Sequence, residues 1–110
     1  MQQFLYRIRP TRLAMLTQGP TAHEAAVVAA HFDYLQRLVA EDVVLMAGRT
    51  LTADENAFGI AIFVAASEAE AAALMHNDPA VQQGIMKAEL FPYRVALWSH
   101  KGPPDDGDAG

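Results

Sequence analysis

The chain opens with a regular alternation of residues. In residues 3–9, QFLYRIR, every second side chain from Phe4 to Ile8 falls on one apolar side, and this period of two predicts a strand. Pro10 interrupts the pattern, so we expect a loop over residues 10–20. Further apolar runs predict three more strands, over residues 43–48, 57–65 and 88–98.

Helical periodicity and capping signals separate these strands. Thr21 and Glu24 fit a capping box, T-x-x-E, in which each side chain satisfies the other residue's backbone amide, so a helix is predicted over residues 22–40. Its expected buried stripe is Val28, Phe32, Leu35 and Val39. Ser67 and Glu70 repeat the capping pattern and open a second helix, SEAEAAALMH, which ends near residue 77.

A short helical turn is predicted between the second helix and the last strand. Asp78 is a suitable N-cap, Pro79 suits the first helical position, and Gly84 closes the turn. The predicted order is therefore strand, helix, strand, strand, helix, strand. This order indicates an α+β protein, a ferredoxin-like βαββαβ plait with a four-stranded antiparallel sheet and both main helices on one face.

The predicted central strands have no polar face. The strand 57–65 places one apolar set on each side: Phe58, Ile60, Ile62 and Val64 against Gly59, Ala61, Phe63 and Ala65. The strand 43–48 divides in the same way: Val43, Leu45 and Ala47 against Val44, Met46 and Gly48. Because the helices cover one face of the sheet, we expect an identical chain to cover the other. The prediction is a homodimer of plaits packed sheet to sheet, a dimeric α+β barrel.

Composition narrows the class of protein. The 110 residues suffice for one domain, which we place at residues 1–100, followed by an acidic Gly/Pro-rich tail over 101–110 that we expect to be disordered. A formal net charge of −5 argues against nucleic acid and acidic membranes as partners. The absence of cysteine excludes disulfides and thiolate catalysis. No leader peptide or membrane span is evident, so a cytoplasmic location is expected.

His31 is the first candidate for chemistry. It lies in the apolar run VVAAHFDYLQRL, where an imidazole is costly to bury unless its nitrogens find partners. His31 is either a histidine at the edge of the core or a functional base, and Asp33 is expected to face solvent. Asp78 is either a plain N-cap or the partner of His31. His31 lies roughly 15 Å along the first helix, so Asp78 reaches it only if NDPAVQQG folds back over that helix.

The other titratable residues give weaker signals. His23 is expected at the surface, His76 at a helix C-terminus and His100 in the tail. No histidine pair has a metal-ligand spacing, and no glycine-rich phosphate loop follows a strand, so we expect neither a metal nor an organic cofactor. Four methionines are expected to fill the core: Met15, Met46, Met75 and Met86.

Two segments, HFDYLQRLVAEDVVLMAGRTL and HNDPAVQQGIMKAELFPYRVALW, resemble the YciI-like (YCII-related) family, and the likeness extends over residues 3–98. The matching features are the helix histidine His31, the glycine turn at Ala47-Gly48, Asp78-Pro79 with Gly84, and Pro92-Tyr93. The resemblance implies a dimeric α+β barrel and a catalytic His31–Asp78 pair. That pair would move a proton on a small, cyclic or aromatic molecule, in an elimination or isomerisation that needs no cofactor.

The resemblance has one clear departure. Family members often carry Arg-Pro a few residues before the histidine, where this chain has Val27 to Ala30. The candidate replacements for that arginine are Arg7, Arg9, Arg12, Arg49 and Arg94. The expected pocket lies between helices and sheet, with walls from Phe32, Phe63, Tyr6 or Trp98. The alternative function is a non-catalytic dimeric module that binds a small ligand or packs with partner domains.

Overall fold

A computed structural model describes residues 1–104 of the chain. Residues 105–110, and with them most of the predicted disorder of the tail, lie outside the described residues. The elements in chain order are β1 (Gln2–Pro10), α1 (Ala14–Thr17), α2 (Ala22–Ala40), β2 (Val44–Arg49), β3 (Gly59–Ala65), α3 (Glu68–His76), α4 (Pro79–Gln82) and β4 (Met86–Pro92).

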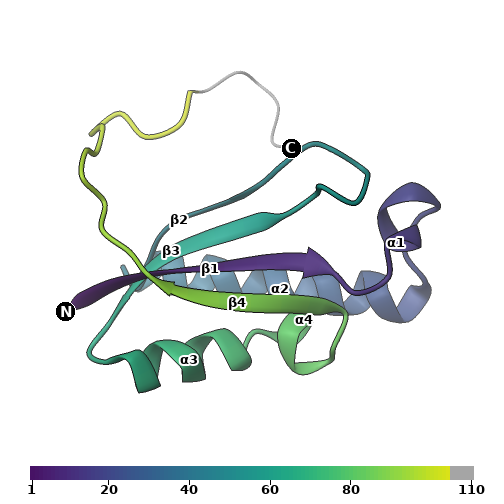
Figure 1. Cartoon of the computed structure of the whole chain (residues 1–110), viewed down its shortest axis with the longest axis horizontal. Helices are drawn as coiled ribbons and strands as arrows, with labels where there is room; N and C mark the ends of the chain where they lie inside the picture. Colours follow the sequence, from purple (N-terminus) through teal and green to yellow (C-terminus); the bar gives the residue numbers. More distant parts are fainter. Residues whose placement is uncertain (105–110) are drawn as a thin grey trace.

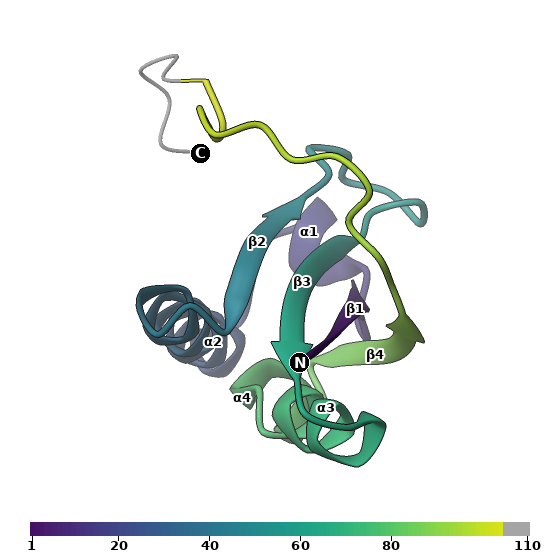
Figure 2. The same ribbon diagram turned by 90° about the vertical axis from the view of Figure 1, so that its left-hand side faces the viewer.

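The strands form one antiparallel sheet in the order β2-β3-β1-β4. Helices α2, α3 and α4 lie on one side of this sheet, and no helix of residues 1–104 covers the opposite side (Figures 1 and 2). This arrangement is the ferredoxin-like plait, and the predicted α+β class is confirmed. We call the side without helices the open face; it is formed by the strand residues that point away from α2, α3 and α4.

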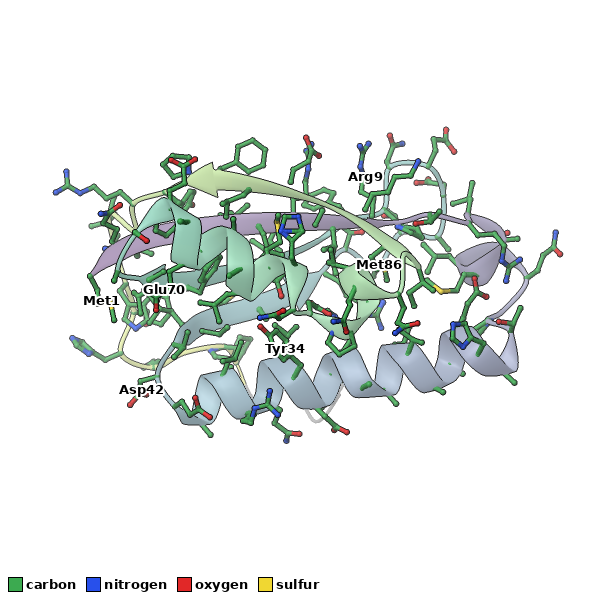
Figure 3. All side chains as sticks on the ribbon, turned by 90° about the horizontal axis from the view of Figure 1, so that it is seen from below. Met1, Arg9, Tyr34, Asp42, Glu70 and Met86 are labelled. Carbon is green, nitrogen blue, oxygen red and sulfur yellow. The ribbon has the colours of Figure 1, made fainter. Side chains whose placement is uncertain are left out.

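The core lies between the sheet and the helices. Phe4, Tyr6 and Ile8 of β1 all point into it, as their alternation predicted. The rings of Phe4 and Phe63 lie 5.9 Å apart between centroids, and those of Tyr6 and Phe63 lie 5.6 Å apart in an edge-on arrangement. Tyr34 extends from α2 toward α3, where its hydroxyl donates to the Leu74 carbonyl at 2.6 Å (Figure 3). The ring contacts join β1 to β3, and the Tyr34 hydrogen bond joins α2 to α3.

The predicted buried stripe of α2 is wrong by about one residue, or 100° of rotation. Phe32 is 63% exposed and Val39 is 47% exposed, while Val28 and Leu35 are only partly buried. The inward face instead carries Glu24, Val27, Tyr34 and Leu38. Both faces of α2 carry apolar residues, so hydrophobic spacing alone does not choose between them. Polar anchors do, since the buried hydroxyl and carboxylate on the inward face both have hydrogen-bond partners.

Two boundaries differ from the prediction. A short helix, α1, lies in the expected loop, where it places Met15 against Val27, Ala80 and Ile85. A single turn is too short to show a period. Strand β4 ends at Pro92 rather than at residue 98, because β1 extends only two residues beyond its pairing with Pro92.

Strand β2 contains an irregularity that changes which side chains share a face. Val44 pairs with Phe63, but the next paired residue of β2, Met46, is opposite Ile62, so the ladder has a bulge at this point. Val44 therefore points to the helices, whereas the strict alternation expected from the sequence placed it with Met46. The alternation predicted for β3 is confirmed, with Phe63 buried on the helix side.

The predicted capping box at the start of α2 is present and is extended by an arginine. Thr21 accepts from the Glu24 backbone at 3.1 Å, and the Glu24 carboxylate accepts from the Thr21 backbone at 2.8 Å. Arg12 adds two hydrogen bonds to the same carboxylate, at 2.9 and 2.5 Å. The loop before α2 is thereby fixed to the helix. At α3 only half of the box forms, since Glu70 accepts from Ala66.

Glu24→Gln is expected to destabilise the fold at neutral pH and to have less effect in acid. The hydrogen bonds from Arg12, with a further one from Thr21, lower the pKa of Glu24 to about 2. Because this folded-state pKa lies below the usual 4.5, the stabilisation is present above the usual value and is lost as the pH falls toward 2. Thermal unfolding of wild type and variant across this range measures the difference. Glu70→Gln is the control. A difference in thermal stability between wild type and Glu24→Gln that does not change with pH would contradict the prediction.

Candidate functional site

The two predicted site residues are in direct contact. His31, at the middle of α2, places Nδ1 2.7 Å from Oδ1 and 2.8 Å from Oδ2 of Asp78. Asp78 is fully buried, and the His31 side chain is 13% exposed. Asp78 was expected to reach His31 only if the segment NDPAVQQG folds back over α2. It does so, because α4 packs against α2 and brings its N-cap residue, Asp78, to the histidine (Figure 1).

Asp78 also serves as the predicted helix cap. Its Oδ1 accepts from the Ala80 backbone N–H at 2.9 Å, Pro79 occupies the first turn of α4, and Gly84 follows the helix with a φ of 74°. The two interpretations of Asp78 considered from the sequence are therefore not alternatives. One carboxylate caps α4 and contacts the imidazole of α2 at the same time.

Tyr6, which the sequence suggested only as a pocket wall, is a hydrogen-bonded member of the site. Its hydroxyl donates to Asp78 Oδ2 at 2.8 Å from the middle of β1, 72 positions away in sequence. Burial raises the pKa of Tyr6, and the negative charge of Asp78 raises it further, so the phenol keeps its proton. The available signal was a tyrosine on the inward side of a strand, where a buried hydroxyl requires a partner.

The second nitrogen of His31, Nε2, reaches the molecular surface. Within residues 1–104, every buried side-chain nitrogen and oxygen has a hydrogen-bond partner, and Nε2 has none among the described contacts. Nε2 is consequently accessible to solvent. The site thus has a buried end, Asp78 with Tyr6, and a partly exposed end, the imidazole of His31. This arrangement allows the ring to exchange a proton with a bound molecule.

The expected pocket walls are not all where the sequence placed them. Phe63 and Tyr6 are packed in the core, whereas Phe32 is 63% and Trp98 54% exposed. Two surface hollows occur elsewhere on residues 1–104. One, of about 220 Å³, involves Arg9, Asp54, Glu55 and Lys87, and the other, of about 240 Å³, involves Met46, Phe58 and Ile60.

The remaining histidines do not join the site. His76 directs Nδ1 to the Ala72 carbonyl at 3.0 Å, at the C-terminal end of α3, and His23 and His100 are exposed. Within the described ranges, no three His, Cys, Asp or Glu side chains gather in a way that could hold a metal ion. No helix in residues 1–104 is long and apolar enough to cross a membrane.

The arginines considered as replacements lie mostly on other surfaces. Arg7 forms an ion pair with Glu89 at 2.6 Å, and Arg9 lies 3.7 Å from the same carboxylate. Their register across β1 and β4 places them on the open face, away from the helical layer that holds His31. Arg12 is engaged with Glu24 at the start of α2. None of these three side chains can therefore take the place, beside His31 of the same chain, of the arginine that family members often carry before the histidine.

Fold and site together define a class of protein: a ferredoxin-like α+β chain in which a buried carboxylate holds a surface histidine. The sequence matches the YCII-related domain over residues 5–94, and the chain therefore belongs to the YCII-related family. A similar solved structure is the 5-chloro-2-hydroxyhydroquinone dehydrochlorinase of Burkholderia phenoliruptrix AC1100 in complex with 2,5-dihydroxybenzoquinone. The two chains are 22% identical, with a TM-score of 0.60, over 83% of this chain and 93% of the other. A search of curated proteins gives no significant match.

Proposed function

We propose that this protein is a cofactor-independent enzyme in which His31, oriented by Asp78, moves a proton to or from a small cyclic or aromatic substrate. The observation that carries the proposal is the contact of 2.7 Å between His31 Nδ1 and a carboxylate that is fully buried. A buried charge of this kind is costly, so a carboxylate retained behind an accessible imidazole suggests a chemical purpose.

The reactions that fit are elimination and isomerisation. In an elimination, Nε2 takes a proton from the substrate while a leaving group such as halide departs with its bonding electrons, so no oxidant or reductant is needed. In an isomerisation, the proton taken from one atom is returned to another. In both reactions Asp78 keeps the imidazole ring oriented and stabilises the imidazolium that forms when Nε2 takes the proton.

The substrate class is supported by the similar structure. That dehydrochlorinase, by its name, acts on a chlorinated hydroxyhydroquinone, and it was solved with a dihydroxybenzoquinone. We therefore place the substrate of this chain among hydroxylated, quinone-like rings or related small cyclic molecules. Such a molecule would bind at the surface over Nε2, where α2 and α4 meet.

A substrate panel tests the proposal. Halogenated hydroquinones, hydroxyquinones and unsaturated lactones are incubated with the full chain, and ring absorbance and halide release are recorded. We expect at least one compound to react faster than without protein, and this turnover to require His31. No reaction with any compound, together with saturable binding of one of them, would instead favour the non-catalytic ligand-binding module. That module is consistent with the position of both surface hollows away from His31.

We further propose a homodimer through the open face. This face is apolar over β2 and β3, where Met46 is 36% and the adjoining Phe58 39% exposed around the hollow of about 240 Å³. Beyond β4, the segment of residues 93–104 runs on the same side of the sheet (Figure 2), with Leu97 92% exposed. Exposed apolar side chains on a sheet face without helices are typical of an interface between subunits.

Met46→Glu is expected to weaken the dimer by at least about tenfold in dissociation constant, since an unpaired carboxylate would be buried at the interface. Sedimentation equilibrium of wild type and variant measures the change. Leu51→Glu is the matched control, because Leu51 is 83% exposed in the segment after β2 and lies off the sheet. A wild-type chain that is monomeric at micromolar concentration would contradict the proposed dimer.

A further inference from the structure

The buried carboxylate of Asp78 is surrounded by donors. Oδ1 accepts from the Ala80 backbone N–H at 2.9 Å, and Oδ2 accepts from the Tyr6 hydroxyl at 2.8 Å. His31 Nδ1 lies within 2.8 Å of both oxygens. A backbone N–H only donates, so Oδ1 must act as an acceptor toward Ala80.

Tyr6 determines what the other oxygen does. A phenol can donate or accept, and a carboxyl proton on Oδ2 could point to Tyr6 or to Nδ1 if the phenol did not donate. In the structure the Tyr6 hydroxyl donates to Oδ2 at 2.8 Å, and burial raises the pKa of Tyr6, so the phenol keeps the proton that it donates. With both oxygens engaged as acceptors, the contact with His31 requires a proton on Nδ1.

We propose that Tyr6 is a positioning residue: by donating to Asp78, it holds neutral His31 in the tautomer with its proton on Nδ1 and a free lone pair on Nε2. The catalytic meaning of this inference rests on the proposed function. In the resting protein His31 is then a base, and the reaction begins with proton transfer from substrate to Nε2. The electron pair of the broken bond stays on the substrate until the leaving group departs or the proton returns.

Tyr34 provides a matched comparison. It is a second buried tyrosine in the same core, its pKa is also raised chiefly by burial, and its hydroxyl donates to the Leu74 carbonyl instead of to Asp78. Tyr6→Phe and Tyr34→Phe each remove one buried hydroxyl with its hydrogen bond. A purely structural effect would be similar in both variants, whereas an effect through Asp78 would be confined to Tyr6→Phe.

Nitrogen NMR of the labelled chain, at a pH where His31 is neutral, reads the tautomer directly. We expect an Nδ1–H form for His31 in wild type and in Tyr34→Phe, and a substantial Nε2–H population in Tyr6→Phe. Acylation by diethyl pyrocarbonate, which needs a free nitrogen lone pair, gives the second readout. His31 should react at least twofold more slowly in Tyr6→Phe, while His23, His76 and His100 keep their rates.

The inference would be overturned if the His31 tautomer populations and acylation rate in Tyr6→Phe were the same as in wild type. If Tyr6→Phe does not fold, the proton NMR spectrum of the wild-type chain tests the inference instead. A slowly exchanging Tyr6 hydroxyl proton close to the His31 Nδ1 proton supports the inference, and an Nε2–H tautomer in wild type overturns it. These measurements need no substrate, so an inactive protein with an Nδ1–H tautomer would refute the proposed enzyme and leave the role of Tyr6 standing.

Discussion

Asp78→Ala is expected to lower the free energy of unfolding by about 3–5 kcal/mol, because it removes the acceptor of a buried hydrogen-bonded pair. Three donors then lose their partner: the Tyr6 hydroxyl, His31 Nδ1 and the Ala80 backbone N–H. Each buried donor left unsatisfied costs about 1–3 kcal/mol. Small domains have about 5–15 kcal/mol in total, so this single change would remove a large fraction of the stability.

Urea unfolding followed by circular dichroism measures the loss. Asp33→Ala is the matched control, since Asp33 lies on the exposed side of α2 and its removal should change the free energy of unfolding by less than about 0.5 kcal/mol. Asp78→Asn keeps an acceptor oxygen and should lie between the two. A loss for Asp78→Ala no larger than that of Asp33→Ala would contradict the energetic role given to the buried carboxylate.

His31→Ala is expected to lower kcat by about 10²–10⁴-fold on whichever panel compound reacts, which is the usual contribution of a positioned acid–base group. The loss should fall on kcat more than on KM, because the imidazole exchanges its proton in the transition state rather than in substrate binding. Steady-state kinetics on the folded variant, checked by circular dichroism, measures the effect.

His76→Ala separates chemistry from the mere presence of an imidazole. His76 is exposed at the end of α3, and its ring contacts a backbone carbonyl of its own helix. The variant should retain kcat within about twofold. Turnover in His31→Ala equal to that of His76→Ala would show that the reaction does not pass through the imidazole of His31.

Local signals in the sequence were sufficient to predict the four strands and helices α2, α3 and α4, but not α1. The capping pair Thr21 and Glu24, and the Asp78-Pro79 start of α4, are short-range features whose physics acts within one turn of helix. The alternation of β1 is equally local. The apolar setting of His31 and the cap position of Asp78 made both residues candidates, and the family resemblance then implied that they form a catalytic pair. The structure brings them into contact; their catalytic role stays a prediction.

What the sequence did not predict depends on tertiary contacts. The bulge after Val44 and the rotation of α2 that exposes Phe32 follow from how strands and helices pack, and neither has a spacing of its own. Tyr6 was recognised as an apolar position of β1, but its partner lies at the far end of the chain. Periodicity identifies the side of an element that is buried and does not identify the polar group it meets.

The distances along the chain between the site residues have a kinetic consequence. Tyr6 and Asp78 are 72 positions apart, and His31 and Asp78 are 47 positions apart. Contacts between such remote segments close large loops, and closing them is a slow part of folding. A nascent chain in which β1 and α2 have already formed still lacks the carboxylate that orients His31. The His31–Asp78 contact therefore forms only once the segment that carries Asp78 has been made and has packed against α2, so a chain that ends before Asp78 lacks it.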